Sequence, residues 1–324
     1  MIVLFSVANF RSFSTEESFS LVAGKPLSTS HQTHVIPIPD TTTAQVLKTA
    51  VLYGANGAGK SNLFKALDYL RMLVLKPRKK NSGTGREVFR FAENTSQLPS
   101  RFDLQFITQG KLYRFGCAVT DQYIIEESLV QVIGGQEKAV YERITDEDGK
   151  VTIETREAKN RNQKLAALVT VGGPQNQTFL ATIRATLDDS FAEAQVFRYF
   201  LLCRVGNVFL LPTIFIKLKA KFVTALSIKG KLNENTCLFM LQYLVLKFLE
   251  FFLKSSVDEQ RQIIVTTHES HLLDLDLLRR DEIWFAEKGI NGATHLYSLS
   301  DFKPRKDFDI RKHYLQGRFS AIPC

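Results

Sequence analysis

Residues 54–61, which read GANGAGKS, constrain the fold of this chain more than any other segment. They satisfy the pattern GxxxxGK[ST] through Gly54, Gly59, Lys60 and Ser61. Glycines allow successive backbone N–H groups to point inward at a phosphate without clashes from Cβ atoms. In such a loop the lysine contacts the β- and γ-phosphates of a nucleotide, and the hydroxyl ligates magnesium. The segment therefore predicts a phosphate-binding loop, or P-loop.

The flanking segments predict a strand before this loop and a helix after it. Residues 49–53 (TAVLY) form a short apolar run that leads directly into the glycines. After the loop, apolar residues recur at helical spacing from Leu63 to Val74, and Pro77 ends the pattern. Strand, glycine loop and helix in this order are the context that a P-loop requires. A mere glycine turn is therefore the weaker interpretation.

The rest of the chain predicts further strands and helices. Alternating apolar runs between residues 101 and 153, separated by polar turns, predict an antiparallel meander of about five strands. Three more strands are expected at 2–7, 19–22 and 262–266. A hairpin is expected from a strand at 282–286 and a strand at 294–299. We also expect a loop at 28–43 and a helical region, broken by glycines, at 159–200. A short helix is expected at 274–280.

Composition and charge narrow the class of protein. The 324 residues allow one elaborated domain or two, and the net charge of +9 is compatible with a nucleotide or nucleic-acid partner. The four cysteines lack CxxC spacing, which favours reduced thiols in a cytoplasmic protein over a zinc site or disulfide framework. The N-terminus lacks the basic start of a signal peptide. The apolar stretch 237–253 carries charges and falls short of the ~20 residues that span a membrane, so no membrane segment is expected.

Two side chains outside the P-loop are further candidates for the nucleotide site. His268 follows the strand predicted at 262–266, and ligands of α/β sheets bind at the carboxyl ends of strands. There it can bond a γ-phosphate or an attacking water, although a structural histidine is the alternative. Arg11, in the turn NFRSF after the first strand, can reach the phosphates, and an ordinary surface turn is the alternative. His268 and His271 lack the HExxH spacing, which argues against a zinc protease.

These motifs together carry a resemblance to a known family. The first strand with NFRSF, the loop GANGAGKSNL, the meander and IIVTTHESHLLD resemble the ABC-type ATPase heads of the RecF, SMC and OLD-like group. More closely, they are similar to bacterial AAA family ATPases tied to abortive infection and phage defence. Asn62, directly after the P-loop serine, is typical of that group, and the tail 301–319 also looks like the family's ending. The resemblance covers about 1–200 and 246–324.

The resemblance implies an α/β fold, a P-loop NTPase of the ABC-type ATPase head with an antiparallel β layer and a shortened helical lobe. One ATPase domain would span 1–324, in four parts: 1–86 with the N-terminal strands and P-loop, the meander 87–157, a degenerate helical lobe 158–245, and 246–324 with the C-terminal strands. Implied cofactors are ATP and Mg²⁺, with Ser61 on the metal. His268 corresponds to the switch histidine of the family. The implied nucleotide-binding residues are Gly54, Ala55, Asn56, Gly57, Ala58, Gly59, Lys60, Ser61, Asn62 and Arg11.

Two motifs that such ATPases use are missing from the sequence. One is the Walker B strand, whose Asp orders the magnesium shell and whose Glu polarises the attacking water. Asp258-Glu259 follows no apolar strand, Asp281-Glu282 precedes its strand, and Glu147-Asp148 lies in a predicted turn. The other is a serine-glycine signature, for which Ser227–Gly230 is a weak substitute. Residues 195–233, where these motifs belong, contain no acidic side chain, as an internal deletion or frameshift would produce.

Two classes of function follow. The first is an ATPase in phage defence or DNA transactions, in which two heads of a homodimer sandwich ATP and a co-encoded effector or nucleic acid is the partner. The second is a non-hydrolysing nucleotide-binding regulatory subunit or damaged gene copy, because nucleotide can bind while hydrolysis is crippled. A nuclease like that of OLD relatives is not expected, because the chain ends at Cys324 without the roughly 50 residues that a further domain needs.

Overall fold

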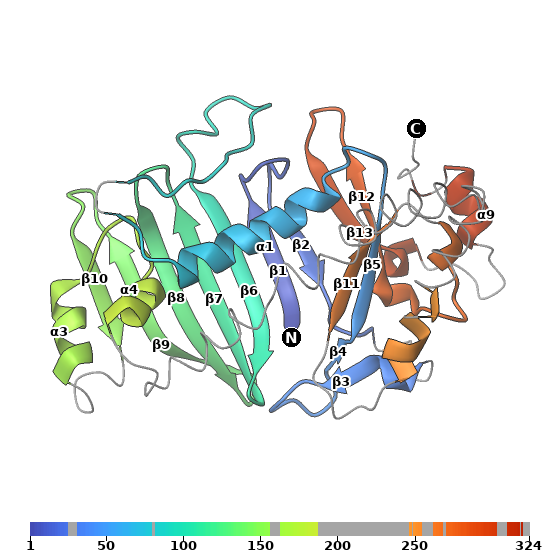
Figure 1. The fold of residues 1–324 in the computed structure, drawn as a ribbon, viewed down its shortest axis with the longest axis horizontal. Coiled ribbons are helices and arrows are strands. Elements are labelled where there is room, and N and C mark those ends of the chain that lie inside the picture. Colours follow the sequence, from blue (N-terminus) through green and yellow to red (C-terminus); the bar gives the residue numbers. More distant parts are fainter. Residues whose placement is uncertain are drawn as a thin grey trace, which may run out of the picture.

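The computed structural model describes residues 1–24, 31–79, 82–155, 163–186, 246–247, 249–254, 262–267, 270–302, 310–317 and 319. Within these residues, two sheets lie next to each other, with the N-terminal strands at the edge of the larger sheet beside the smaller one, and a long helix crosses the face of the larger sheet (Figure 1). A third, two-stranded sheet completes the set.

The larger sheet has seven strands, all antiparallel, in the order β10-β9-β8-β7-β6-β1-β2. The predicted meander is confirmed, because alternating side chains such as Phe102, Leu104 and Phe106 are buried along one face. The N-terminal strands pair with β6 and so extend the meander. The bounds are β1 Ile2–Ala8, β2 Glu17–Ser20, β6 Ser100–Thr108, β7 Lys111–Val119, β8 Ile124–Ile133, β9 Gln136–Thr145 and β10 Val151–Thr155.

The smaller sheet has the order β11-β5-β12-β13. Strand β5 (Thr49–Tyr53) lies between β11 (Ile263–Thr266) and β12 (Ile283–Lys288), parallel to both, and all of its residues are buried. That position explains its short, wholly apolar run, since a central parallel strand is covered on both faces. Strand β13 (Thr294–Ser298) closes the predicted hairpin with β12.

Helix α1 (Lys60–Leu75) begins directly after the P-loop and lies across one face of the seven-stranded sheet (Figure 1). Its side chains at Leu63, Leu67, Leu70 and Val74 are buried, as their helical spacing predicts. Further helices include α3 (Gln163–Val171), α4 (Phe179–Thr186) and α9 (Ile310–Leu315), and residues 246–247 and 249–254 are also helical. Short 3-10 turns lie at Gln32–His34, Ser270–Leu272, Arg280–Glu282 and Leu299–Phe302. Glycines 172 and 173 separate α3 from α4, as expected.

Two predictions about local structure are wrong. The expected loop 28–43 contains strand β3 (Val35–Pro37), which pairs with β4 (Gln45–Leu47) because their apolar side chains reach the core. The expected helix 274–280 is a turn followed by a 3-10 turn. There the side chain of Asp274 accepts a hydrogen bond from the N–H of Asp276 (2.8 Å), a local bond that competes with helix formation.

The apolar residues form two clusters. One joins α1 to the seven-stranded sheet, and the other surrounds β5, β11 and β12 together with Leu249, Leu253, Ile310 and Tyr314. Among the residues that the structure describes, no helix is long and apolar enough to cross a membrane.

Candidate functional site

The P-loop lies at the carboxyl edge of the four-stranded sheet, between the end of β5 and the start of α1. Two of its glycines are held against neighbouring atoms. A Cβ on Gly54 would lie 2.4 Å from the carbonyl oxygen of Ala286, and one on Gly59 would lie 1.9 Å from Thr294 Oγ1. Gly59 also has a φ of +102°, in the left-handed region that favours glycine. Both positions therefore require glycine.

The start of α1 is suited to an anion. Gly59 is the N-terminal cap residue of this 16-residue helix, and it offers no side chain to bond the first N–H groups. Those groups and the positive end of the helix dipole form an anion site. Gly57, at the crest of the loop, has no atom within 4 Å of where its Cβ would lie, which leaves space for a ligand.

Lys60 folds back over the loop. Its Nζ donates hydrogen bonds to the carbonyl oxygens of Gly54 (2.6 Å) and Ala55 (2.8 Å), and the residue is buried. Burial lowers the pKa of the Lys60 ammonium to about 8. A phosphate in the loop would supply the negative charge that favours the protonated form, so the donor set fits the phosphates of a nucleotide.

Ser61 and Asn62 occupy the first turn of α1. Ser61 is exposed, so its hydroxyl is accessible to a magnesium ion beside the phosphates. Asn62 instead turns toward the protein, and its Nδ2 donates to Ser12 Oγ (2.9 Å). The two neighbouring polar residues thus have different surroundings, and magnesium binding by Ser61 stays a prediction.

Arg11 lies beside this assembly but already has an acidic partner. Its guanidinium forms an ion pair with the carboxylate of Glu87, and its backbone N–H donates to the Glu87 carbonyl oxygen (2.7 Å). The next residue, Ser12, contacts Asn62. The turn NFRSF therefore adjoins the P-loop, while a contact of Arg11 with a nucleotide stays a prediction.

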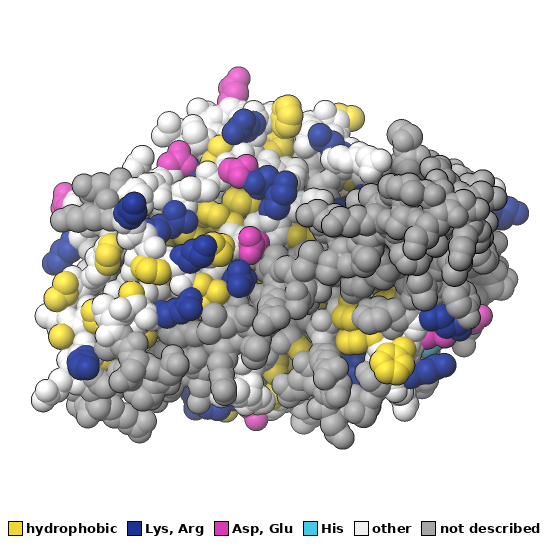
Figure 2. Space-filling model, in the orientation of Figure 1, with side chains coloured by type: hydrophobic (Ala, Val, Ile, Leu, Met, Phe, Trp, Pro, Cys, Tyr) yellow, Lys and Arg dark blue, Asp and Glu magenta, His cyan; other side chains and the backbone are white. Residues whose placement is uncertain are grey.

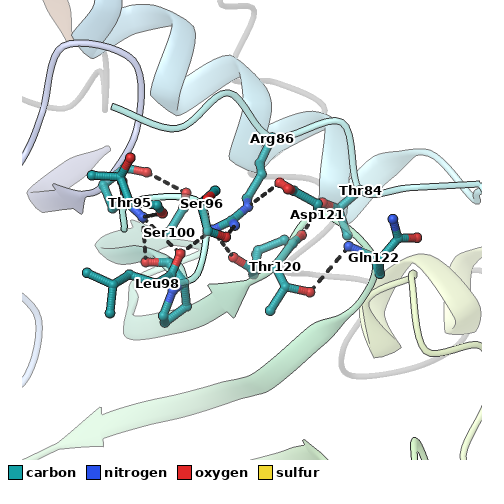
Figure 3. A network of polar contacts seen from close by, with 12 residues as sticks. Thr84, Arg86, Thr95, Ser96, Leu98, Ser100, Thr120, Asp121 and Gln122 are labelled. Carbon is teal, nitrogen blue, oxygen red and sulfur yellow. Dashed lines mark hydrogen bonds and ion pairs between the residues drawn. The ribbon is translucent and has the colours of Figure 1, made fainter. Parts of the chain in front are cut away.

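The segment that holds Glu87 is anchored by a network around Arg86 (Figure 3). The buried guanidinium donates to Asp121 Oδ1 (2.6 Å) and to the carbonyl oxygens of Ser96 (2.7 Å) and Leu98 (2.5 Å). Asn9, from the NFRSF turn, donates to the same segment at the Leu98 oxygen (2.9 Å). These bonds fix the segment that pairs with Arg11.

His268 lies outside the described residues. The strand before it is placed: Thr266 of β11 is in register with Leu52 of β5, and the N–H of Thr267 donates to the Leu52 carbonyl oxygen (3.1 Å). The described end of β11 is therefore level with the end of β5, where the P-loop begins. The role of His268 stays a prediction.

The pair Asp281-Glu282 is not a Walker B motif. It precedes β12, and Ile283 is in register with Val51, so the pair lies at the edge of the sheet opposite the P-loop. Burial raises the pKa of Glu282 well above its ordinary value, and His34 Nδ1 lies 3.0 Å from its carboxyl group. Glu147-Asp148 is in a turn, as predicted. Asp258-Glu259 and the residues 227–230 lie outside the described residues.

Sequence reasoning missed two residues that touch the P-loop. Thr294 Oγ1 lies 2.9 Å from the carbonyl oxygen of Ala58 and 2.7 Å from Ser12 Oγ. The sequence marks Ser12 only as part of the NFRSF turn and Thr294 only as the start of a strand. No local pattern marks either residue, because the fold alone brings them together.

A separate groove of about 610 Å³ lies on strands β1, β2 and β6 to β9. Its charged side chains are largely paired with one another: Arg114 donates to Asp103 (2.7 Å), and Arg101 pairs with Glu126. The residues that line this groove include none of 54–62, so it is distinct from the P-loop.

Comparison with known proteins finds a family model that is similar to the part of the chain that holds the P-loop. Residues 50–162 match the family model described as "AAA domain, putative AbiEii toxin, Type IV TA system". The solved structure "SMC head domain from Thermotoga maritima" is 12% identical, covering 92% of this chain and 98% of that chain with a TM-score of 0.35. No curated protein matches the chain. The range that matches the family model contains the P-loop and helix α1.

Proposed function

We propose that this protein binds ATP with Mg²⁺ at residues 54–62. The observation that carries the proposal is the buried Lys60 ammonium, held by two loop carbonyls at the uncapped start of α1. The N–H groups of the loop and the helix would hold the phosphates, Lys60 would neutralise them, and Ser61 would ligate the magnesium. Bound Mg²⁺ would supply charge neutralisation on the β- and γ-phosphate oxygens.

Equilibrium binding of a fluorescent ATP analogue, with magnesium and with EDTA, tests this proposal. Lys60→Ala is expected to weaken binding at least about tenfold, as the loss of a charged hydrogen bond implies. Lys65→Ala is the matched control, since Lys65 is an exposed lysine of the same helix, and its affinity should stay within about twofold of the wild type. Equal binding by wild type and Lys60→Ala would refute the proposal.

ATP would act by joining two copies of the chain, as in the ATP-sandwiched heads that the resemblance implies. The energy of nucleotide binding would then shift an equilibrium between monomer and dimer rather than perform chemistry on a separate substrate. Measurement of molar mass by light scattering, with and without MgATP, is the test. With MgATP, wild type is expected to form a dimer and Lys60→Ala is not. A molar mass of wild type that does not change with MgATP would contradict nucleotide-driven dimerisation.

The alternative is a regulatory subunit that binds ATP without hydrolysing it. The specific observation in its favour is the position of Asp281-Glu282, at the sheet edge away from the P-loop. A turnover assay separates the two functions. ATP hydrolysis at ~1 s⁻¹ or faster, lost in Lys60→Ala, would favour the ATPase with His268 acting on the γ-phosphate or the attacking water.

The biological setting that we propose is phage defence or DNA transactions in the cytoplasm. The description of the matched family model, which includes the words "putative AbiEii toxin, Type IV TA system", supports a role in phage defence. The net charge of +9 and the basic side chains on the face that carries α1 and α4 support a nucleic-acid partner (Figure 2). Phage challenge of bacteria that express wild type or Lys60→Ala tests the role in phage defence. Salt-dependent binding of a DNA duplex tests the role in DNA transactions.

A further inference from the structure

We infer that Thr294 and Ser12 are positioning residues for the P-loop, which hold it in its phosphate-binding form before any nucleotide arrives. This inference rests on the proposed function. The hydroxyl clamp consists of four groups in contact with one another in sequence: the Ala58 carbonyl, the two hydroxyls of Thr294 and Ser12, and the Asn62 side chain.

The clamp is a continuous chain of hydrogen bonds. Thr294 Oγ1 lies 2.9 Å from the Ala58 carbonyl oxygen, which can only accept, so the single hydroxyl proton of Thr294 goes there. The same Thr294 Oγ1 also lies 2.7 Å from Ser12 Oγ, within hydrogen-bond distance. Ser12 Oγ in turn accepts from Asn62 Nδ2 at 2.9 Å. Thr294, which links Ala58 to Ser12 in this chain of contacts, is buried.

The clamp encloses the part of the loop that carries the chemistry. It is attached at Ala58 and at Asn62, so Gly59, Lys60 and Ser61 lie between its two ends. Both hydroxyl oxygens of the clamp lie close to Gly59, where a Cβ would be 1.9 Å from Thr294 Oγ1 and 2.8 Å from Ser12 Oγ.

The bond to Ala58 fixes the direction of a peptide group. In a trans peptide the C=O and the next N–H point in opposite directions. With the Ala58 carbonyl turned toward Thr294, the N–H of Gly59 points away from Thr294. That N–H belongs to the set that meets the phosphates in a P-loop. The clamp thus orders part of the loop backbone before phosphate binds, and such preorganisation raises the affinity of the loop for phosphate.

The backbone supports the clamp independently of the hydroxyls. The N–H of Thr294 donates to the carbonyl oxygen of Ser12 (2.7 Å), which joins β13 to the NFRSF turn. Removal of a hydroxyl should therefore leave the strand and the turn in contact while it releases the Ala58 peptide. This makes Thr294→Val, which keeps the shape and removes the hydroxyl, the informative variant.

The experiment compares Thr294→Val and Ser12→Ala with Thr294→Ser, which restores the hydroxyl. The control is Thr49→Val, because Thr49 Oγ1 is also buried and also donates to a carbonyl oxygen, that of Ile263 (3.0 Å), but at the other end of β5. Affinity for the fluorescent ATP analogue with magnesium should fall about 3- to 10-fold in Thr294→Val and Ser12→Ala, the range of one lost hydrogen bond. It should stay within about twofold in Thr294→Ser and Thr49→Val.

Hydrogen exchange of the nucleotide-free protein gives a second readout that a general loss of stability would not reproduce. Peptides that cover 54–62 should exchange faster in Thr294→Val than in Thr49→Val at equal distance from the unfolding midpoint. Wild-type affinity together with wild-type exchange in Thr294→Val would overturn the clamp. If Thr294→Val does not fold, Ser12→Ala decides in its place. If wild type itself binds no nucleotide, the proposed function fails, and the exchange measurement alone judges the clamp.

Discussion

At the scale of single residues, Lys60 links the electrostatics of the P-loop to a measurable property. Its ammonium is buried against carbonyl oxygens, and this burial lowers its pKa to about 8. Bound phosphates add negative charge close to the ammonium and so favour its protonated form. The pKa of Lys60 should therefore be higher in the complex than in the nucleotide-free protein.

From this difference we predict that nucleotide affinity falls as pH rises. Well below pH 8 Lys60 is protonated in both states, so its protonation contributes no pH dependence there. Above pH 8 binding requires uptake of a proton, and affinity should fall by up to about tenfold per pH unit until the pKa of the complex is reached. Titrations of the ATP analogue between pH 7.5 and 9.5 measure this. Lys60→Arg, whose side chain stays charged, should bind with no such slope; a slope shared by both proteins would contradict the assignment to Lys60.

The residue scale also shows where sequence reasoning reaches its limit. The glycines, Lys60 and Ser61 were predictable because one local pattern defines them. Ser12 and Thr294 are separated by most of the chain, and each is an ordinary polar residue where it stands. Their contact arises only when β13 folds beside the NFRSF turn, so the spacing of residue types along the sequence carries no signal for it.

At the scale of elements, a buried carboxylate anchors helix α4. Glu127 accepts from the N–H of Phe179 (2.7 Å) at the start of α4 and from the hydroxyl of Tyr141 (2.6 Å). Burial raises the pKa of Glu127, and the nearby Arg143 opposes that shift. A carboxylate at the N-terminus of a helix bonds the first N–H groups, so Glu127 connects β8 to α4.

We predict that Glu127→Gln lowers the free energy of unfolding by about 1–3 kcal/mol, because the amide brings donors to a site that needs only acceptors. Glu126→Gln is the matched control: the side chain of Glu126 is half exposed, and its ion pair with Arg101 lies at the surface. Exposed pairs contribute little, so the control should change by no more than about 0.5 kcal/mol. Urea unfolding measures the free energy of unfolding of wild type, Glu127→Gln and Glu126→Gln. Equal losses in the two variants would show that Glu127 does not hold α4.

The elements themselves were largely predictable where the pattern is regular. The meander strands alternate, and α1 has a sustained apolar face, so burial and sequence agree. The hairpin of β3 and β4 was missed because Pro37 and the surrounding polar residues look like loop, although Val35, Val46 and Leu47 reach the core. The false helix at 274–280 was too short for its propensity to outweigh the turn made by Asp274.

At the scale of the whole molecule, a few side chains join the two sheets. Gln262 bonds three backbone groups of two different segments: its Oε1 accepts from the N–H of Ile2 (2.7 Å), and its Nε2 donates to the carbonyl oxygens of Ile2 (2.9 Å) and Leu47 (2.9 Å). At another point, Glu17 of β2 accepts from the N–H of Leu296 in β13 (2.8 Å). Sequence patterns predict strands but not which sheet each joins, so this junction could not be anticipated.

The junction leads to a prediction that separates stability from nucleotide binding. Gln262 precedes β11, at the end of that strand opposite the P-loop. Gln262→Ala should lower the free energy of unfolding by about 2 kcal/mol, because it leaves backbone groups of Ile2 and Leu47 without these partners. Gln136→Ala, at an exposed position, should leave stability unchanged within about 0.5 kcal/mol. Under conditions where both variants are folded, their affinity for the ATP analogue should equal that of wild type, since the hydroxyl clamp is intact in each. Weaker binding by folded Gln262→Ala would mean that the P-loop depends on how the two sheets are joined as well as on its own contacts.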